Sequence, residues 1–247
     1  MKQESGNSTI ILTGDTHGDF RRIADFCKRF ETKPSDIMII LGDAGFNFWG
    51  GLRDSISKEF VSRLPITVFC IHGNHEQRPE HIPSYDLTEW HGGQVWIEPE
   101  YPNIIFAKDG EIYDFNGRKA IVIGGAYSVD KPYRLAQGFG WWEDEQPSDE
   151  IKKRVEEQLE KENWQIDIVL SHTTPRKYEP TEVFLSCLDQ SEIDKSTEDW
   201  LDTIEDRLTY KDWYCGHFHT DKTIDKLNIL FESYIELTGD QYGRNHR

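Results

Sequence analysis

Five short polar motifs, each directly after a run of apolar residues, constrain the fold of this chain more than any other feature of its sequence. They are Gly-Asp-Thr-His-Gly at 14–18, Gly-Asp at 42–43, Gly-Asn-His-Glu at 73–76, Ser-His at 171–172 and Gly-His-Phe-His at 216–219. The apolar runs before them have the length and composition of buried strands. In open α/β sheets, ligands bind at the carboxyl ends of the strands. The five motifs are therefore expected to converge on one site.

The first third of the chain alternates between two patterns. Short apolar runs predict strands, and apolar residues at helical spacing predict the helices between them. Strands are expected at 10–12, 37–41 and 66–71, and helices at 19–30 and 52–64. This order is typical of a largely parallel sheet covered by helices.

The rest of the chain has shorter and more varied patterns. Strands are expected at 104–106, 111–115, 119–123, 166–170, 213–215, 222–224 and 229–232. Asn116-Gly117 predicts a hairpin turn, and Ser148 is expected to cap a helix that runs to about residue 161. Residues 124–147 have no clear period, and a loop of this length is usually functional. The tail after Leu237 is expected to lack regular secondary structure.

Two predicted helices have an apolar stripe that is expected to face the core. In the helix at 52–64 the stripe consists of Leu52, Ile56, Phe60 and Leu64. In an acidic surface helix at 191–208 it consists of Ile193, Trp200, Leu201, Ile204 and Leu208.

The predicted fold class is α/β, with two mixed β-sheets packed as a central sandwich and flanked by helices in four layers. Residues 1–247 are expected to form a single domain because no linker interrupts the pattern. Within it, residues 124–147 are the long, lid-like loop.

Composition limits the partners. The formal net charge is -17, and such a field repels polyanions, so it argues against extended nucleic acid without excluding it. No apolar run approaches the roughly 20 residues of a membrane span, and the N-terminal residues lack a signal-peptide pattern. The cysteines Cys27, Cys70, Cys187 and Cys215 form no close pair, which favours a reducing compartment. We therefore expect a cytoplasmic protein with no membrane partner.

The motifs contain seven plausible metal ligands, a number that exceeds what one ion needs. They are Asp15, His17, Asp43, Asn74, His172, His217 and His219. Imidazole and carboxylate together suit manganese, iron, zinc or nickel. Such a set is typical of two ions about 3.5–4 Å apart that share one carboxylate. The glycines in the motifs allow sharp turns and close approach of the backbone.

These motifs resemble those of the calcineurin-like metallophosphoesterase superfamily, which are G-D-x-H-G, G-D, G-N-H-[DE], a lone histidine after a strand, and G-H-x-H. All five occur in order between residues 14 and 219. The resemblance implies that Asp15, His17 and His219 hold one divalent ion. It implies that Asn74, His172 and His217 hold the second and that Asp43 bridges them. Among the possible metals, manganese is the one that we expect.

The resemblance also implies a reaction. It identifies His75 as a catalytic residue that contacts the scissile phosphate and protonates the leaving group, beside the bridging ligand Asp43. Two such ions lower the pKa of a shared water, and the hydroxide formed attacks the phosphorus of an ester. The histidines outside the motifs, His72, His81, His91 and His246, are expected to be structural or exposed.

One part of the superfamily pattern is missing. In the protein phosphatase branch the second motif continues as G-D-x-x-D-R-G, but here residues 42–47 read Gly-Asp-Ala-Gly-Phe-Asn. The carboxylate that would orient His75 is therefore absent there, and Glu76 or Asn47 remain as alternatives. Arg78 and Arg134 are candidates to bind substrate phosphate. Trp141 and Trp142 are candidates to stack on a substrate ring or to pack beneath the loop.

The favoured function is that of a phosphomonoesterase acting on a small metabolite or a phosphoprotein. The alternative is a phosphodiesterase acting on nucleotides or nucleic acid. It stays open because residues 124–130 loosely resemble a segment of RNA lariat debranching enzymes in the same superfamily. A scaffold without catalysis is disfavoured because every ligand is retained.

Overall fold

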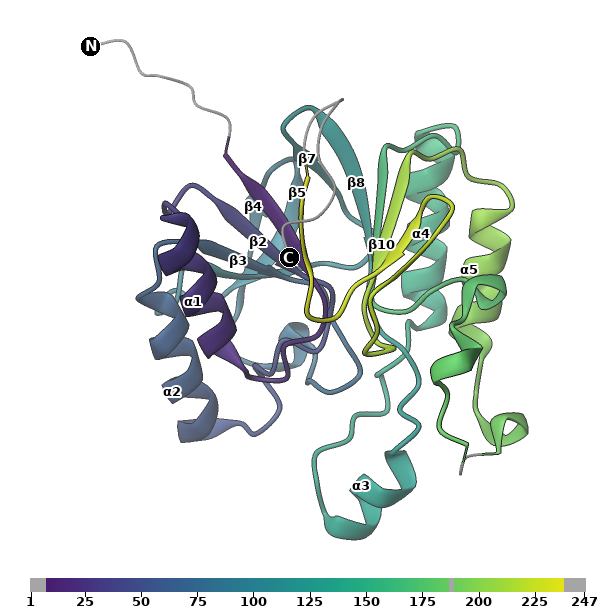
Figure 1. Cartoon of the computed structure of the whole chain (residues 1–247), viewed down its shortest axis with the longest axis horizontal. Coiled ribbons are helices and arrows are strands. Elements are labelled where there is room, and N and C mark those ends of the chain that lie inside the picture. Colours follow the sequence, from purple (N-terminus) through teal and green to yellow (C-terminus); the bar gives the residue numbers. More distant parts are fainter. Residues whose placement is uncertain (1–7, 187–188, 238–247) are drawn as a thin grey trace.

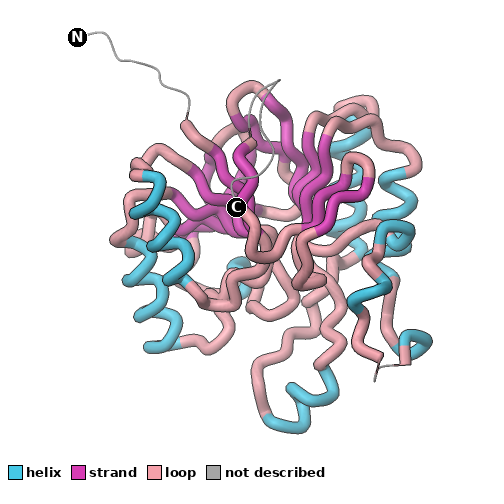
Figure 2. Tube along the Cα trace, in the orientation of Figure 1, coloured by secondary structure: helices cyan, strands magenta, loops and turns pink. Residues whose placement is uncertain are grey.

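The computed structural model describes residues 8–186 and 189–237, and in these residues two β-sheets pack face to face (Figure 1). Helices cover the outer face of each sheet (Figure 2). The four-layer α/β sandwich predicted from the sequence is confirmed. Cys187, His246 and the tail after Leu237 lie outside the described residues.

The first sheet has a parallel centre and antiparallel edges. Its order is β13 (Tyr234–Glu236), β1 (Ile10–Thr13), β2 (Ile37–Ile40), β3 (Thr67–Cys70), β6 (Ile104–Ala107), β5 (Gly93–Ile97) and β4 (Asp86–Trp90). The strands β1, β2, β3 and β6 are parallel to one another. The helices α1 (Phe20–Phe30) and α2 (Gly51–Ser62) lie on its outer side.

The second sheet has the same plan. Its order is β11 (Lys222–Ile224), β12 (Leu227–Ile229), β10 (Asp212–Cys215), β9 (Ile168–Ser171), β8 (Arg118–Ile123) and β7 (Ile112–Phe115). The four strands β8, β9, β10 and β12 are parallel. The helices α4 (Asp149–Lys161) and α5 (Ser196–Glu205) cover it.

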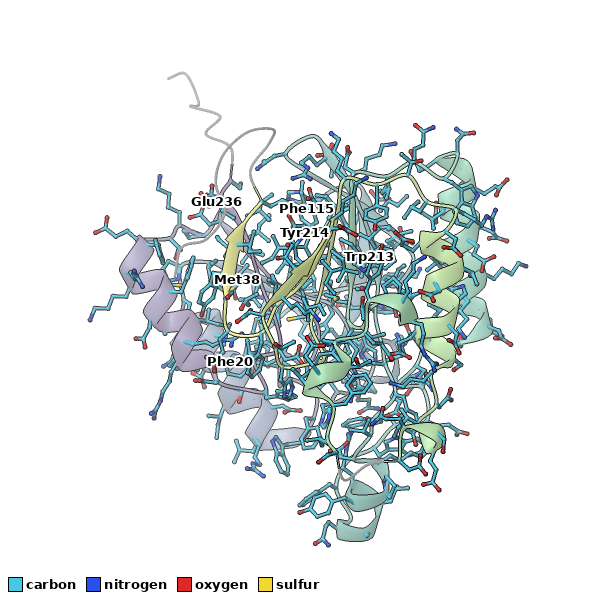
Figure 3. The ribbon with its side chains drawn as sticks, turned by 45° about the vertical axis from the view of Figure 1, so that its right-hand side comes forward. Phe20, Met38, Phe115, Trp213, Tyr214 and Glu236 are labelled. Carbon is cyan, nitrogen blue, oxygen red and sulfur yellow. The ribbon has the colours of Figure 1, made fainter. Side chains whose placement is uncertain are left out.

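Side chains alternate between the two faces of each strand, and this alternation builds three apolar layers. In β1, Ile10 and Leu12 point between the sheets, whereas Ile11 packs under the helices. In Figure 3, Phe20 and Met38 belong to the layer beneath α1, and Trp213 belongs to the layer on the side of α4 and α5. Continuous apolar runs are therefore explained by burial on both faces.

Several local predictions are confirmed. The Oγ of Ser148 accepts a hydrogen bond from the N–H of Ile151 at the start of α4. Asn116 and Gly117 both have positive φ, at 55° and 83°, as a two-residue hairpin turn requires.

The prediction for the apolar stripe of α2 is wrong. Leu52, Ile56 and Phe60 are 76%, 59% and 43% exposed, and only Leu64 packs against the core. The buried face instead carries Asp54, Lys58 and Val61. Asp54 accepts hydrogen bonds from the N–H groups of Trp49 and Gly50, and Lys58 lies 2.5 Å from a carboxylate oxygen of Glu98. These polar contacts rotate the helix away from the orientation that its apolar residues predict.

Other differences concern elements with weak patterns. The strands β4, β5 and β13 were not predicted, and the loop at 124–147 contains the helix α3 (Lys131–Gln137). The acidic helix begins at Ser196 rather than at 191, so Ile193 lies outside it. In the hairpin at the end of the chain, the second strand is β12, two residues before the predicted one. None of the described helices has the length and hydropathy that a membrane span needs.

Candidate metal centre

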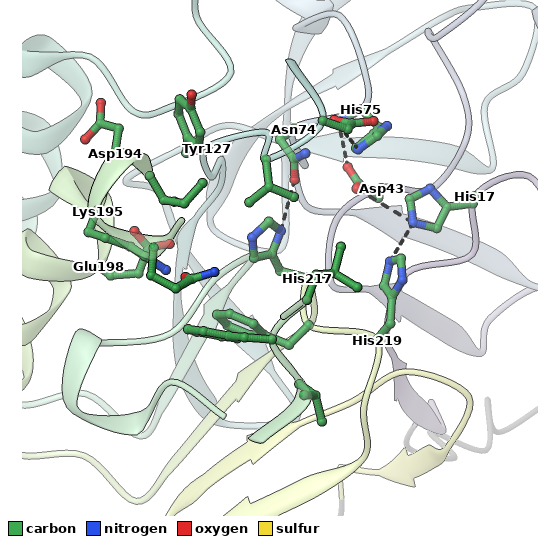
Figure 4. Close-up of a pocket in the computed structure, with 18 residues that line it drawn as sticks. His17, Asp43, Asn74, His75, Tyr127, Asp194, Lys195, Glu198, His217 and His219 are labelled. Atoms are coloured by element: carbon green, nitrogen blue, oxygen red, sulfur yellow. Dashed lines mark hydrogen bonds and ion pairs between the residues drawn. The ribbon is translucent and has the colours of Figure 1, made fainter. Parts of the chain in front are cut away.

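The seven predicted ligands lie together at the seam between the two sheets. Asp15 and His17 follow β1, Asp43 follows β2, and Asn74 follows β3 in the first sheet. The three others, His172, His217 and His219, follow β9 and β10 in the second sheet. Figure 4 shows most of this cluster, with His17, Asp43, Asn74, His217 and His219 turned toward one another. The parallel strands place their carboxyl ends at one edge, as the sequence predicts.

One group of ligands is formed by Asp15, His17 and His219. The Nε2 atoms of the two histidines are 2.9 Å apart, and Oδ2 of Asp15 lies 3.3 Å from that of His219 and 3.7 Å from that of His17. Asp15 is 1% exposed, and its Oδ2 has no hydrogen-bond partner. A buried carboxylate oxygen without a donor is costly unless a cation neutralises it. This arrangement fits a metal ion.

A second group is formed by Asn74, His172 and His217. Oδ1 of Asn74 lies 2.8 Å from Nε2 of His172 and 3.1 Å from Nδ1 of His217. Nδ1–H of His172 donates to the carbonyl of Leu41 at 2.8 Å, so in the neutral ring Nε2 carries the lone pair. The amide nitrogen of Asn74 is directed to Oγ of Ser128 at 2.9 Å, so its Oδ1 is also an acceptor. Two facing acceptors indicate a shared cation.

Asp43 lies between the two groups. Its Oδ2 is 3.9 Å from Nε2 of His17, and its Oδ1 is 3.7 Å from Nε2 of His172. Oδ1 also accepts the backbone N–H of His75 at 2.8 Å. One oxygen is therefore directed toward each group, which is the geometry that a bridging carboxylate needs.

Two glycines allow the carboxylates to take these positions. A Cβ at Gly73 would lie 2.0 Å from Oδ1 of Asp43, and a Cβ at Gly216 would lie 2.2 Å from Oδ1 of Asp15. Any side chain at either position would displace the carboxylate. Glycine is therefore required at 73 and 216, because the backbone there lies against Asp43 and Asp15, respectively.

The electrostatics favour the ligand forms of Asp43 and His217. Burial by itself raises the pKa of Asp43, but His172, His75 and His17 together hold that pKa below its usual value. Burial, with a further contribution from His172, lowers the pKa of His217 to about 3. At neutral pH the carboxylate is ionised and this imidazole is neutral, as metal binding requires.

His75 lies at the edge of the cluster and is 26% exposed on its side chain. Its ring stacks on Phe48, with centroids 6.2 Å apart. Among the described residues, the carboxylate paired with its ring is that of Asp130, whose Oδ1 is 3.7 Å from Nε2 of His75 and 3.8 Å from Nη1 of Arg134. Burial lowers the pKa of His75, whereas Asp43 and Asp130 oppose this effect. Asp130 was not identified from the sequence.

Neither of the two residues considered for orienting His75 has a described contact with its ring, although each also keeps one buried polar atom without a partner. Oε1 of Glu76 accepts the N–H of Gly73, and Oδ1 of Asn47 accepts the hydroxyl of Tyr85. The only sequence signal for Asp130 is its place in a loop expected near the cleft, four residues before Arg134.

Arg78 and Arg134, the candidates for phosphate binding, are 4% and 2% exposed. Nη1 of Arg78 lies 2.5 Å from a carboxylate oxygen of Asp109. Arg134 donates to the carbonyls of Gly140 and Asn74 and to Oγ of Ser128. These contacts engage both guanidinium groups in the protein, and neither belongs to the described walls of the two cavities.

The two tryptophans of the loop also make internal contacts. Nε1–H of Trp141 donates to Glu145, and Lys131 lies over its ring. Trp142 meets the ring of Phe48 edge to face. Contacts within the loop and with Phe48 therefore account for both residues.

Two cavities open from the cluster, one on each side of His17 and His75. The first has a volume of about 450 Å³ and is lined by Tyr127, Phe184 and Glu198 among others (Figure 4). The second has a volume of about 420 Å³ and extends along α2, past Trp49 and Arg53. The ligand cluster therefore lies between two clefts.

Comparison with known proteins gives a family and a fold. The sequence model of the family described as calcineurin-like phosphoesterase matches residues 8–221. The crystal structure of TT1561 of Thermus thermophilus is 13% identical, with a TM-score of 0.52, and the alignment covers 92% of this chain and 89% of that one. This similarity supports the fold. A comparison with curated proteins finds no match.

Two other solved structures are more distant. Phosphopantetheinyl hydrolase from Mycobacterium tuberculosis is 15% identical, with a TM-score of 0.41 and coverage of 97% and 100%. A protein serine/threonine phosphatase from Saccharomyces cerevisiae is 11% identical, with a TM-score of 0.31 and coverage of 93% and 68%. These scores are too low to support an inference about this chain.

Proposed function

The chain belongs to the calcineurin-like phosphoesterase family and is thus a metal-dependent hydrolase of phosphoric esters, and we propose that the seven-ligand cluster is its catalytic centre. The observation that carries this proposal is the pair of facing acceptors, Nε2 of His172 and Oδ1 of Asn74, at 2.8 Å. Two acceptors without a proton between them repel each other unless a cation lies close to both.

We assign the ligands to two divalent ions. Asp15, His17 and His219 would hold the first, and Asn74, His172 and His217 the second. Asp43 would contact both, because its two oxygens are directed to different groups. Manganese fits this mixture of imidazole, amide and carboxylate, as do iron, zinc and nickel. When bound, such ions lower the pKa of a water molecule and offset negative charge on phosphate oxygens.

His75 is proposed to donate a proton to the leaving oxygen of the ester. Its side chain lines both cavities and is therefore within reach of a phosphate at the cluster. Asp130 is proposed to hold the ring in place, since its carboxylate pairs with Nε2. Arg134 then supports Asp130 and the backbone of Asn74 rather than the substrate. We propose a supporting role of the same kind for Arg78, through Asp109.

Phosphomonoester hydrolysis remains the first candidate reaction. The net charge of -17 favours small esters or phosphoprotein segments over long nucleic acids. Phosphodiester hydrolysis is the second candidate, and one observation favours it. Because both cavities meet at His17 and His75, an ester at the cluster could extend a substituent to each side.

Two further proposals concern the chain as a whole. We propose a single domain in which residues 124–147 form a lid-like segment over the cluster. The hydrogen bonds from Ser128 and Arg134 to Asn74 support this arrangement. We also propose a cytoplasmic location, on the basis of the unpaired cysteines among the described residues.

The proposal is tested with purified protein that has been stripped of metal and reloaded with Mn²⁺. Metal content and hydrolysis of p-nitrophenyl phosphate and bis(p-nitrophenyl) phosphate are measured together. We expect about two ions per chain and turnover that depends on them. Absence of bound metal after reloading, together with no turnover of either ester, contradicts the assignment of the cluster as a catalytic centre.

A further inference from the structure

The cavity on the α2 side has no assigned occupant. It is bounded by His17 and His75 at the metal cluster and by Trp49, Arg53, Ile56 and Ser57 farther out. We call it the Trp49–Arg53 cleft. It is continuous with the proposed catalytic centre, because the two histidines belong to the walls of both cavities. A group bound here would therefore be attached close to the phosphorus of an ester held at the cluster.

The guanidinium of Arg53 is available for a ligand. Its Cζ lies 3.7 Å from the ring centroid of Trp49, and no carboxylate in the described part of the chain forms an ion pair with it. The adjacent acid, Asp54, accepts hydrogen bonds from the N–H groups of Trp49 and Gly50 instead. Those bonds fix the backbone that carries the indole. Arg53 is exposed and places a positive charge beside the cluster in a chain whose net charge is -17.

Apolar surface surrounds this pair. Trp49 is 51% exposed and Ile56 is 59% exposed. Phe48 continues the aromatic surface toward the cluster, since it meets Trp49 edge to face at 4.8 Å and stacks on His75. Exposed apolar patches of this kind commonly mark ligand grooves. A ligand with a planar ring would cover this surface.

We propose that the Trp49–Arg53 cleft binds a planar aromatic substituent of a small phosphodiester whose other substituent lies in the cleft of Tyr127 and Phe184. The stacked indole and guanidinium offer a flat, polarisable platform for such a ring. The positive charge of Arg53 also attracts the anionic ester to this side of the cluster. The inference rests on the second candidate reaction of the proposed function, phosphodiester hydrolysis, and it identifies the substrate class as aryl or nucleoside diesters of short length.

The test compares two diesters that have the same leaving group and differ in the second substituent. Bis(p-nitrophenyl) phosphate has a second ring, whereas methyl p-nitrophenyl phosphate has only a methyl group. The full chain with Mn²⁺ is assayed for kcat/KM on each. The ratio of interest is kcat/KM for bis(p-nitrophenyl) phosphate divided by kcat/KM for methyl p-nitrophenyl phosphate. We expect Trp49→Ala and Arg53→Ala to lower this ratio by roughly 5- to 10-fold, because the second ring loses its stacking partner.

A matched control removes a similar arginine far from the cluster. The guanidinium of Arg29 on α1 lies 5.2 Å from the ring of Phe30, outside both cavities. Arg29→Ala is expected to leave both values and their ratio unchanged. An unchanged ratio in Trp49→Ala and Arg53→Ala, with the wild type active on both diesters, overturns the cleft assignment alone. A wild type that hydrolyses no ester overturns the proposed function and the cleft assignment together.

Discussion

Oδ1 of Asp130 lies 3.7 Å from Nε2 of His75, although the two residues come from segments that the sequence does not link. The same oxygen has no hydrogen-bond partner and lies 3.8 Å from Arg134. Asp130 and Arg134, both in the 124–147 loop, thus lie beside His75, the histidine whose usual carboxylate partner is missing from the second motif. The loop is attached to the third motif through Ser128 and Asn74, so this placement depends on the fold of the loop.

Replacement of Asp130 by Asn is expected to lower kcat by roughly 10-fold for esters with poor leaving groups, and less for p-nitrophenyl esters. A mispositioned His75 protonates the leaving oxygen less well, and good leaving groups need that proton least. Rates across a series of leaving groups provide the measurement.

Asp144→Asn is the matched control for this change, because Asp144 lies in the same loop but pairs with His81 at 3.0 Å and with Arg78 at 3.7 Å rather than with His75. It is expected to leave the leaving-group dependence as in the wild type. Equal losses in the Asp130 and Asp144 variants would indicate only a disturbed loop.

Replacement of Asp43 by Asn is expected to weaken the binding of both metal ions and to lower turnover by roughly a thousandfold or more, because one carboxylate is proposed to hold both ions.

His75→Asn is expected to lower turnover by about 10²–10⁴-fold while metal content stays unchanged. Metal analysis of dialysed proteins distinguishes the two. Loss of metal from the His75 variant would show that its assigned role is wrong.

Addition of Mn²⁺ to the metal-free protein is expected to raise its melting temperature. Binding to the folded state alone contributes about 2.7 kcal/mol at 100 times Kd, which corresponds to roughly 5–10 °C for a chain of this size. Calorimetry with and without a chelator measures the shift. The Asp43→Asn variant should show a much smaller one, and an equal shift would mean that manganese binds elsewhere.

Glu198 should make the folded state less stable as pH rises from about 4.5 to 6. Burial raises the pKa of this glutamate from its usual value near 4.5 to about 6, although Thr173 donates a hydrogen bond to it. The unfolded chain therefore releases the proton first, and the free energy of unfolding falls by roughly 2 kcal/mol across this interval. Glu198→Gln should remove that fall. Glu192→Gln, at an exposed position, should retain it, and a persistent fall in Glu198→Gln would contradict the assignment.

The corrected orientation of α2 also predicts stabilities. Leu52→Gln should change the free energy of unfolding by no more than about 0.5 kcal/mol, because Leu52 is 76% exposed. Val61→Ala should cost roughly 2 kcal/mol, because Val61 is fully buried. Urea unfolding of both variants measures the difference. A larger loss of unfolding free energy in the Leu52 variant than in the Val61 variant would instead support the orientation of α2 predicted from the sequence.

The parallel strands and the convergence of the motif residues could be predicted from the sequence because both depend on local signals. Buried parallel strands read as apolar runs, and each motif follows such a run, so the edge where Asp15, Asp43 and Asn74 meet could be anticipated. The orientation of α2 could not, because the pairing of Lys58 with Glu98 is a tertiary contact. Asp130 was missed for a related reason, since no periodicity connects its loop to His75. The strand β4 was missed because four of its five residues are exposed and carry little apolar pattern.

The pairing of β13 with β1 has a consequence for the synthesis of the chain on the ribosome. Strand β1 can pair with β2 early, but it cannot pair with β13 until residues 234–236 have been translated, and His217 and His219 also emerge late. A nascent chain that has made only the strands β1 to β6 holds Asp15, His17, Asp43 and Asn74 without the histidines that complete either group. Metal capture is therefore expected only near the end of translation or after release, and shortened chains should remain without metal.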